Sequence, residues 1–381
     1  MGTLCLIKGH KPLISETFID THIQRLPGEK VVLYNYFPEY TLNGRTLRYF
    51  YSRRPWLTKA HRLLPQFLYD RLVTRHEMSD ERTMDFMAGF FRQHNVDVIL
   101  AEYGFNGADI APVAKALGIP LVVHFHGHDA HREPEISAYR DRYRFMFQYA
   151  YRCLSVSHYM TQAMLELGAD PQRIVYNPYG AREYFFDVQP DYRPTLIAVG
   201  RFADIKAPYL TLAAFQLIAK DNPNARLVMV GDGPLLECCR SLARTWNLEA
   251  QVSFPGALVH EQFLPLLSQA RAFVQHSVVT SYRDAEGTPN SILEAQAAGL
   301  PVISTRHAGI NEAVVHGETG FLVAERDIED MARRMQQLLR DEPLCRLMGA
   351  AARRHISTNY SINRHIGTLS DVLNQARCLP R

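Results

Sequence analysis

Residues 286–305 read EGTPNSILEAQAAGLPVIST, and this stretch decides what kind of fold the chain can adopt. Thr288 is a favourable N-cap, and Pro289 suits the first helical position because proline lacks the N–H that would have no partner there. Gly299, with Pro301 two residues later, is a favourable helix end. The run PVIST (301–305) then has the Val and Ile content of a buried strand. The stretch therefore predicts a helix of about ten residues that leads into a buried strand.

The same alternation of amphipathic stretches and short apolar runs extends along nearly the whole chain. The apolar runs are continuous and rich in Val, Ile and Leu, as expected for parallel strands that are buried on both faces. Helical segments between such strands indicate a βαβ architecture and an α/β fold. The predicted strands are 4–7, 31–34, 96–102, 120–126, 153–157 and 174–177 in a first series, and 195–200, 226–231, 252–254, 272–277, 301–305 and 320–323 in a second.

The two series are separated by DVQPDYRPT (187–195), a polar stretch with two prolines and no apolar period. We therefore predict two doubly wound, Rossmann-like domains, residues 1–187 and 188–360. Two such domains leave a cleft between the carboxyl ends of their strands, where ligands of these sheets normally bind. The stretch SINRHIGTLSDVLNQAR (361–377) predicts one more helix after the second domain is complete.

The composition is that of a soluble globular protein of 381 residues. The formal net charge of +3 is too small to indicate nucleic-acid binding by itself. No apolar run reaches the ~18 residues needed to span a bilayer. The apolar stretch at the start is too short for a signal peptide, and Leu6 does not complete a myristoylation signal. Six scattered cysteines without a CxxC pair indicate reduced thiols in a cytosolic protein.

The predicted helix after Thr288 offers an anion site at its amino end. The free N–H groups of Asn290 and Ser291 would point out of this positive end, and phosphate is the usual anion there. Glu294 lies one turn deeper on the same face, ~6 Å along the axis, which is roughly the offset between the phosphate and the ribose of a nucleotide. Glu286 would face whatever lies beyond the phosphates. The alternative is an ordinary capped helix with two solvated acids.

Two cations follow a predicted strand in VGRFADIK (199–206). Arg201 offers a planar fork and Lys206 a point charge, so together they could hold a diphosphate. The alternative is a solvated basic loop. The glycine turn VGDGP (230–234) is too short for a dinucleotide fingerprint.

Four histidines lie within HFHGHDAH (124–131), at the end of a predicted strand. Such a cluster suggests a metal, and a metal-dependent hydrolase is one hypothesis. The order of the residues differs from H-x-H-x-D-H, because His128 precedes Asp129. The other hypothesis is a single working imidazole, His126, at a turn made by Gly127 and anchored by Asp129. It could donate to a sugar hydroxyl or to a developing charge.

Several motifs, taken in order, resemble glycosyltransferase family 4. VGRFADIK, VGDGP, EGTPNSILEAQAAGLPVIST and GETGFLV are similar to the carboxyl-terminal half of this family, whose hallmark is an E-x7-E pair, here Glu286 and Glu294. GIPLVVHFHGHD and CLSVSHYMTQAML resemble segments of its amino-terminal half. The resemblance implies the GT-B fold, in which two Rossmann-like domains face a cleft. It also implies a retaining transferase that takes a sugar from a nucleotide-sugar donor without a metal or another cofactor.

The resemblance also implies roles for individual residues. Glu294 would bind the ribose, Glu286 would contact the donor sugar, and His126 would line the catalytic cleft, so Glu286 and His126 are the catalytic candidates. The last helix, within residues 361–381, would cross back onto the first domain, which would serve as the acceptor side, while 188–360 would bind the donor. The further donor-binding candidates are Arg201 and Lys206, the amides of Gly287, Thr288, Pro289, Asn290 and Ser291, and, facing the base, Gly256 and Leu258 in the turn 256–259. Gly9 is a further donor-binding candidate, but its loop KGHKPLISETFI (8–19) is a departure, because Gly9 stands alone where many family members carry Gly-Gly.

This chemistry needs no metal on the leaving group. The bond to the anomeric carbon breaks as diphosphate leaves, and Arg201, Lys206 and the helix amides would stabilise the charge that develops. Retention without an obvious nucleophile suggests attack on the same face, with the leaving phosphate accepting the acceptor's proton.

The acceptor hypothesis rests on residues 43–76, which hold eight Lys and Arg against a single acid, Asp70, with six aromatics interleaved. Such a surface suits an anionic membrane, so we expect a peripheral contact on the cytosolic face and a glycan or lipid-linked acceptor, with no nucleic acid. The alternative is a solvated basic helix pair packed on the first domain. Three other functions compete: the metal-dependent hydrolase built on His124–His131, a nucleotide-sugar epimerase or phosphorylase, and a non-catalytic nucleotide-binding module. The sequence does not reveal the base, the hexose or the acceptor.

Overall fold

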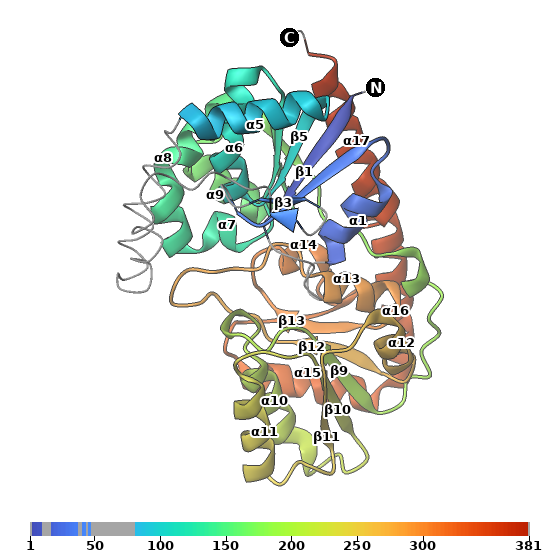
Figure 1. Ribbon diagram of the computed structural model, residues 1–381. Coiled ribbons are helices and arrows are strands. Elements are labelled where there is room, and N and C mark those ends of the chain that lie inside the picture. The colour runs from blue at the N-terminus through green and yellow to red at the C-terminus, as the bar shows by residue number, and fades with distance from the viewer. Residues whose placement is uncertain (1, 10–16, 37–39, 43–44, 47–80, 380–381) are drawn as a thin grey trace.

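The computed structural model describes residues 2–9, 17–36, 40–42, 45–46 and 81–379, which form two parallel-sheet α/β domains (Figure 1). Every strand predicted from the sequence overlaps a strand of the structure. The predicted two-sheet α/β fold is therefore confirmed. Most of the basic window 43–76 lies outside the described residues, so the membrane contact stays a prediction.

The first sheet has the order β4-β3-β2-β1-β5-β6-β7-β8. Its central strands are parallel and almost entirely buried, whereas β3 and β4 form an antiparallel edge that the alternation of apolar runs does not predict. The strands are β1 (Thr3–Lys8), β2 (Lys30–Tyr34), β3 (Thr41–Leu42), β4 (Arg45–Thr46), β5 (Val96–Glu102), β6 (Leu121–His124), β7 (Arg152–Ser155) and β8 (Ile174–Tyr176).

Helices cover both faces of this sheet (Figure 1). The longest of them, α8, packs on α6, which in turn contacts β5 and β6. The helices described in this domain are α1 (Thr17–Arg25), α5 (Glu81–Gln93), α6 (Gly104–Leu117), α7 (His128–His131), α8 (Glu133–Tyr149) and α9 (His158–Glu166), with short 3-10 turns η2 (Pro171–Arg173) and η3 (Glu183–Phe185).

The second sheet is entirely parallel, in the order β11-β10-β9-β12-β13-β14. Its strands are β9 (Thr195–Val199), β10 (Arg226–Val230), β11 (Val252–Gly256), β12 (Ala272–Gln275), β13 (Val302–Thr305) and β14 (Gly320–Val323). Its helices are η4 (Asp204–Lys206), α10 (Pro208–Ala219), α11 (Leu236–Thr245), α12 (His260–Ser268), α13 (Asn290–Ala297), α14 (Ile310–Ala313), α15 (Ile328–Arg340) and α16 (Glu342–Asn359).

In each sheet the strand order reverses at one point, between β1 and β5 in the first and between β9 and β12 in the second. Loops that leave two such strands run in opposite directions, so a crevice opens between them where ligands of open α/β sheets bind. In the second sheet this point lies beside Gly200 and Gln275. In the first it lies beside Gly9 and Glu102.

The last helix, α17 (Ile362–Arg377), returns to the first domain and runs along its side (Figure 1). Leu369 and Leu373 of α17 are buried in one cluster with Leu4, Leu6 and Val98 from β1 and β5. The predicted helix at 361–377 is therefore confirmed, and its apolar side completes the core of the first domain.

The helix of the opening stretch begins one residue later than predicted. Pro289 is the residue before α13, in an extended conformation, and Thr288 does not cap the helix. The Thr288 hydroxyl instead donates to the carbonyl oxygen of Val156 in the first domain. The predicted N-cap at Thr288 is wrong because a partner in the other domain competes for that hydroxyl. Gly299 follows the helix with a φ of 82°, as a helix-ending glycine should.

A second contact between the domains is made by Glu312 at α14. Its carboxylate accepts hydrogen bonds from the N–H groups of His158 (2.8 Å) and Tyr159 (3.3 Å) at the start of α9, and from the Tyr176 hydroxyl (3.2 Å). A carboxylate is favourable at the positive end of a helix. Glu312 therefore ties α14 of the second domain to α9 and β8 of the first.

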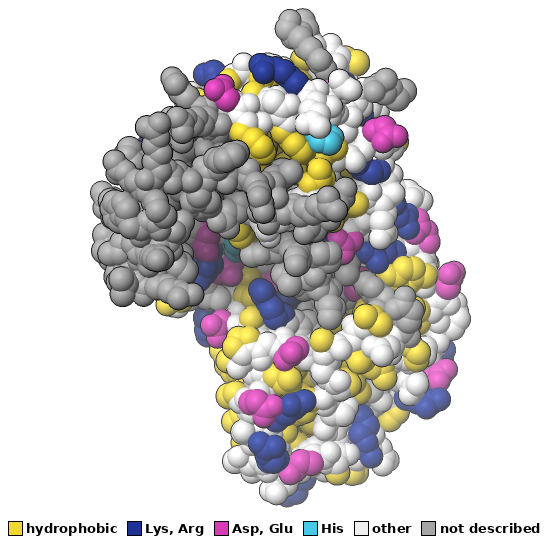
Figure 2. All heavy atoms as spheres, viewed as in Figure 1, with side chains coloured by type: hydrophobic (Ala, Val, Ile, Leu, Met, Phe, Trp, Pro, Cys, Tyr) yellow, Lys and Arg dark blue, Asp and Glu magenta, His cyan; other side chains and the backbone are white. Residues whose placement is uncertain are grey.

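The visible face of the second domain carries both signs of charge. Figure 2 shows Lys and Arg side chains interspersed with Asp and Glu over it, in keeping with the small net charge of +3. Among the residues that the structure describes, no helix combines the length and the apolar character needed to cross a bilayer.

Candidate active site

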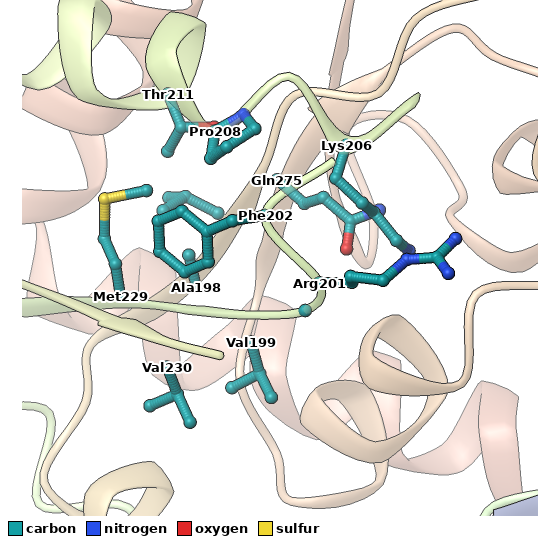
Figure 3. A pocket seen from close by; sticks show the side chains of 12 residues that line it. Ala198, Val199, Arg201, Phe202, Lys206, Pro208, Thr211, Met229, Val230 and Gln275 are labelled. Carbon is teal, nitrogen blue, oxygen red and sulfur yellow. The ribbon is translucent and has the colours of Figure 1, made fainter. Parts of the chain in front are cut away.

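A pocket lies at the reversal point of the second sheet. Gly200, Arg201 and Lys206 line it from the loop after β9, and Gln275 lines it from the end of β12. Figure 3 shows the side chains of Arg201 and Lys206 extending toward the same end of the pocket, away from the apolar end at Phe202. The two predicted cations therefore share one pocket.

The loop after β9 is held by close packing on the loop after β10. A Cβ at Gly231, where φ is 141°, would lie 1.9 Å from the carbonyl oxygen of Gly200. Lys206 ends the short 3-10 turn η4, and a left-handed Ala207 (φ 35°) then turns the chain into α10. The glycine turn VGDGP thus supports the Arg201 loop, a packing role that the short motif did not reveal.

Glu286 is brought to this pocket by residues 285–289, which precede α13 and carry predicted donor-binding residues, so we call them the donor loop. Its carboxylate lies 2.9 Å from the ammonium of Lys206 and accepts a long hydrogen bond of 3.4 Å from the hydroxyl of Ser277. The residue is 9% exposed. The ion pair also places the Lys206 charge beside the loop.

The backbone of the donor loop is anchored by a second pair. The N–H of Glu286 donates to Nε2 of His307 (3.1 Å), and Nδ1 of His307 lies 2.6 Å from the carboxylate of Glu325. Partial burial opposes ionisation of Glu325, but hydrogen bonds from His307 and from the N–H of Val279 outweigh burial and lower the pKa of this carboxyl. An ionised Glu325 requires the His307 proton on Nδ1, which leaves Nε2 free to accept.

A second pocket lies between the domains, on the other side of α13. Asn290 and Glu294 line it from α13, and Tyr179 and Arg182 line it from the first domain. Ser291 faces the other way, since its hydroxyl lies 3.2 Å from Gln275 of the first pocket. Glu286 and Glu294 therefore lie beside different pockets, with the amino end of α13 between them.

On the first domain, the turn after β6 is fixed by Asp129. Its carboxylate accepts hydrogen bonds from the N–H groups of Gly104 (2.8 Å), His126 (3.0 Å) and Gly127 (2.8 Å). The carboxylate thereby holds the turn that the sequence predicts at Gly127. The carbonyl oxygen of His126 in turn faces the donor loop, because a Cβ at Gly287 would lie 2.4 Å from it.

The ring of His126 has partners on both nitrogens. Nε2 lies 2.8 Å from the carboxylate of Glu102, and Nδ1 bonds the hydroxyl of Tyr179. The ring also packs against Phe18, with 4.7 Å between ring centroids. For His126 to donate to a substrate, Glu102 would have to give way, so the predicted direct role of this imidazole stays a prediction.

The four histidines of 124–131 do not form one cluster. His124 ends β6, His126 lies in the turn, and His128 and His131 belong to α7. Among the described residues, the group that comes close enough to hold a metal is His22, Glu102 and His124. The spacing of histidines along the sequence therefore indicated the wrong group of candidate metal ligands, because His22 and Glu102 come from other parts of the chain.

The remaining predicted donor residues lie apart from the two pockets. Gly9 packs against Tyr36 and Asn106 at the end of β1, and Gly256 ends β11 with its carbonyl bonded to the N–H of Gly231. Leu258 is half-buried in the turn before α12. Among described residues, none of these three lines either pocket.

Sequence reasoning missed most of the residues that support the site. They share the property of acting through another group, either the donor loop or the turn after β6. No local motif marks them. The stretch around His307 contains a glycine turn, which by itself indicates no function. These residues are Glu102, Tyr179, Arg182, Gln275, Ser277, His307 and Glu325.

Comparison with known families assigns both domains. Residues 181–355 match the family described as Glycosyl transferases group 1, and residues 38–180 match a Glycosyl transferase 4-like domain. The two matches are adjacent and together span residues 38–355. The chain belongs to glycosyltransferase family 4. The recognition made from the E-x7-E pair and the surrounding motifs is thereby confirmed.

The transferase is similar to other bacterial proteins over more than two thirds of its length. It is 27% identical over 284 residues to a putative colanic acid biosynthesis glycosyltransferase of Salmonella typhimurium, covering 72% of this chain and 70% of that protein. It is 29% identical over 284 residues to an N-acetyl-alpha-D-glucosaminyl L-malate synthase of Bacillus anthracis, covering 71% and 72%. 

The same fold occurs in solved glycosyltransferase structures. Anabaena HepE, crystallised with UDP, superposes with a TM-score of 0.73 at 14% identity, covering 98% of this chain and all of that one. Sucrose-phosphate synthase of Thermosynechococcus elongatus superposes with a TM-score of 0.71 at 17% identity, covering 98% and 99%. The transferase therefore has the GT-B fold.

The close approach at Gly287 gives a first prediction. In Gly287→Ala the new methyl group would meet the His126 carbonyl oxygen, which is backbone and cannot rotate away, so the donor loop and the turn after β6 must separate. We expect kcat to fall about tenfold, because small displacements of positioning groups weaken catalysis strongly. Thermal unfolding should show that the protein still folds.

Gly367→Ala is the matched control, because its Cβ would meet no atom within 4 Å and its helix gains a better helix former. Its turnover should equal that of the wild type. Equal turnover in Gly287→Ala would show that the contact between the two loops does not position the site.

Proposed function

We propose that the transferase moves a hexose from a nucleotide-sugar donor to a hydroxyl group of a glycan or lipid-linked acceptor. The observation that carries this proposal is the pairing of Glu286 with Lys206 beside the amino end of α13, in a pocket shared with Arg201. A diphosphate at that helix end would meet free N–H groups and two cations. The sugar on its far side would reach Glu286.

The comparisons support a nucleotide-sugar donor and suggest where it is used. HepE structures contain UDP or UDP-glucose, so UDP-hexoses are the first donors to test. Relatives are named for colanic acid and amylovoran biosynthesis. We therefore place the reaction in cell-surface polysaccharide synthesis, on the cytosolic side, with the acceptor held by the first domain (1–187 with 361–381) and the donor by 188–360.

The environment of Glu286 supports a retaining reaction without an enzyme nucleophile. Its carboxylate is already engaged by Lys206 and Ser277, which reduces its power to attack the anomeric carbon. The acceptor hydroxyl would then attack on the face that the diphosphate leaves, with a phosphate oxygen accepting its proton. Arg201, Lys206 and the α13 amides would stabilise the leaving group, so that no metal is required.

A thermal-shift screen against UDP, GDP, ADP and their sugars tests the donor. A ligand at 100 times its Kd stabilises the protein by ~2.7 kcal/mol, which is readily measured. The preferred sugar nucleotide is then incubated with acceptor glycans in EDTA, and the anomeric configuration of the product is read by NMR. A strict requirement for added Mg²⁺ or Mn²⁺, or turnover without any acceptor, would overturn the proposal.

Glu294 is expected to bind the ribose, which gives a second prediction. Glu294→Ala should weaken binding of both the free nucleoside diphosphate and the sugar donor by ~1.5–3 kcal/mol, the scale of hydrogen bonds to a charged group. Calorimetry measures this loss. Glu318→Ala, an exposed carboxylate remote from both pockets, is the control. Unchanged nucleotide affinity in Glu294→Ala would refute the ribose assignment.

A further inference from the structure

A chain of buried hydrogen bonds runs from the crossing helix α17 to the turn after β6. Nε2 of His365 lies 2.8 Å from Nε2 of His22 on α1, and Nδ1 of His22 lies 2.7 Å from the carboxylate of Glu102 on β5. The other oxygen of Glu102 lies 2.8 Å from Nε2 of His126. All four side chains are buried. This chain of hydrogen bonds therefore joins residues that are far apart in the sequence.

The proton positions at the α17 end follow from the acceptors. Nδ1 of His365 lies 2.9 Å from the carbonyl oxygen of Pro178, which can only accept, so Nδ1 carries the proton. Burial lowers the pKa of His365 to about 3, which makes the ring neutral and leaves Nε2 as an acceptor. The hydrogen bond between the two rings then requires His22 to donate from Nε2.

The proton positions at the other end follow from Glu102. Burial opposes its ionisation, but the charge of His22 and the further interactions with His126 and His22 outweigh burial and hold the pKa of this carboxyl well below its usual range. An ionised Glu102 accepts from Nδ1 of His22, so His22 carries two protons and a positive charge. One imidazolium balances one carboxylate. A second buried charge would lack a partner, so His126 is neutral and Nδ1 accepts from Tyr179.

The other charged groups near Glu102 leave this balance intact. Lys8, beside it on β1, pairs with Asp20 (3.0 Å). His124 lies 3.6 Å from Glu102, and burial lowers the pKa of His124 well below its usual range, so it is neutral. A metal held by His22, Glu102 and His124 would have to displace two satisfied hydrogen bonds of a charge-balanced pair. Hydrogen bonding therefore explains this cluster better than a metal does.

Both ends of this chain of hydrogen bonds reach the site. His365 and Tyr179 line the pocket that holds Glu294, and the His126 backbone abuts Gly287 of the donor loop. We propose that His22, Glu102 and His365 are positioning residues that hold His126 as a neutral imidazole with its proton on Nε2. Through these residues, the position of α17 on the first domain controls the turn that faces the donor loop. This inference rests on the proposed function, because it assumes that the turn takes part in transfer.

Substitutions at His365 distinguish the effect of its hydrogen bonds from the effect of α17 packing. His365→Leu removes the acceptor for the second proton of His22, so His22 loses its charge more readily and Glu102 loses its partner. The carboxyl of Glu102 then takes up a proton at higher pH. The acid limb of the pH profile of kcat should therefore move to higher pH. At pH 7 we expect kcat to fall about tenfold with KM for the donor nearly unchanged.

His365→Gln should restore the wild-type profile, because its amide can donate to Pro178 and its carbonyl can accept from His22. Leu369→Ala is the packing control, since Leu369 lies on the same helix and is fully buried but outside the chain. It should lower the unfolding temperature without moving the acid limb. An unmoved acid limb in His365→Leu, or a shift of equal size in Leu369→Ala, would overturn the proposal.

Two-bond ¹⁵N–¹H correlation spectra of ¹⁵N-histidine-labelled protein test the charge states without any assay of transfer. The expected pattern is a doubly protonated His22, a neutral His126 with its proton on Nε2, and a neutral His365 with its proton on Nδ1. A neutral His22, or a stoichiometric divalent metal that is lost in Glu102→Gln, would refute the inference. The expected pattern in a protein that transfers no sugar would instead reject the proposed function and the positioning role, while leaving the charge states established.

Discussion

Glu286→Gln is expected to lower kcat by about 10³-fold while the Kd for the nucleoside diphosphate stays within about threefold, because its proposed contact is with the sugar and with charge that develops in the transition state. Gln keeps the shape of the side chain but removes the negative charge beside Lys206, 2.9 Å away. Single-turnover kinetics with the preferred donor and calorimetry with the free nucleotide measure the two quantities.

The control for this variant is Glu325→Gln, which weakens the anchor of the same loop through His307 but leaves the Glu286 carboxylate in place. Its turnover should lie between those of the wild type and Glu286→Gln. If Glu286→Gln lost nucleotide affinity and turnover to the same extent, Glu286 would belong to the nucleotide site and its assignment to the sugar would be wrong.

Lys206→Met is expected to lower kcat by about 10²- to 10³-fold and to weaken binding of the nucleoside diphosphate, because the ammonium would stabilise the departing phosphates. Methionine retains an unbranched apolar stem without the charge. The variant also leaves Glu286, which is 9% exposed, without its cation, so some loss of thermal stability should accompany it.

Lys220→Met, an exposed lysine just after the other end of α10, should match the wild type. The double variant Lys206→Met with Glu286→Gln tests the ion pair itself, since coupled residues show non-additive effects. Fully additive losses of log kcat would mean that the two side chains act on the ligand independently, and full activity in Lys206→Met would remove the lysine from the mechanism.

The sequence predicted the fold well because the decisive signal is local. Each buried parallel strand is a short apolar run, and runs such as 96–102 and 226–231 mark their strands without any knowledge of neighbours. The edge pair β3 and β4 was missed because strands of two residues carry too little pattern. The N-cap at Thr288 was misassigned because its hydroxyl bonds Val156, a partner 132 residues away.

The candidate site could be predicted only where its residues lie in a contiguous sequence motif. Arg201, Lys206, Glu286 and Glu294 lie in two such motifs, and the structure places them around one helix end. The supports of these residues could not be predicted, because the contacts are long-range. Glu102 reaches His126 across 24 residues, and His365 reaches His22 across 343.

The return of α17 to the first domain has a consequence for how the protein is made. The side of β1 and β5 that receives Leu369, Val372 and Leu373 lacks this part of its cover until α17 is synthesised. At about 5–20 residues per second, some 200 residues must be added after β8 before that cover exists, which takes roughly 10–40 s. During this interval the nascent first domain presents an apolar surface on the ribosome. We therefore expect the second domain to reach its native state first, and emergence of α17 from the ribosome to be the event that allows the first domain to close.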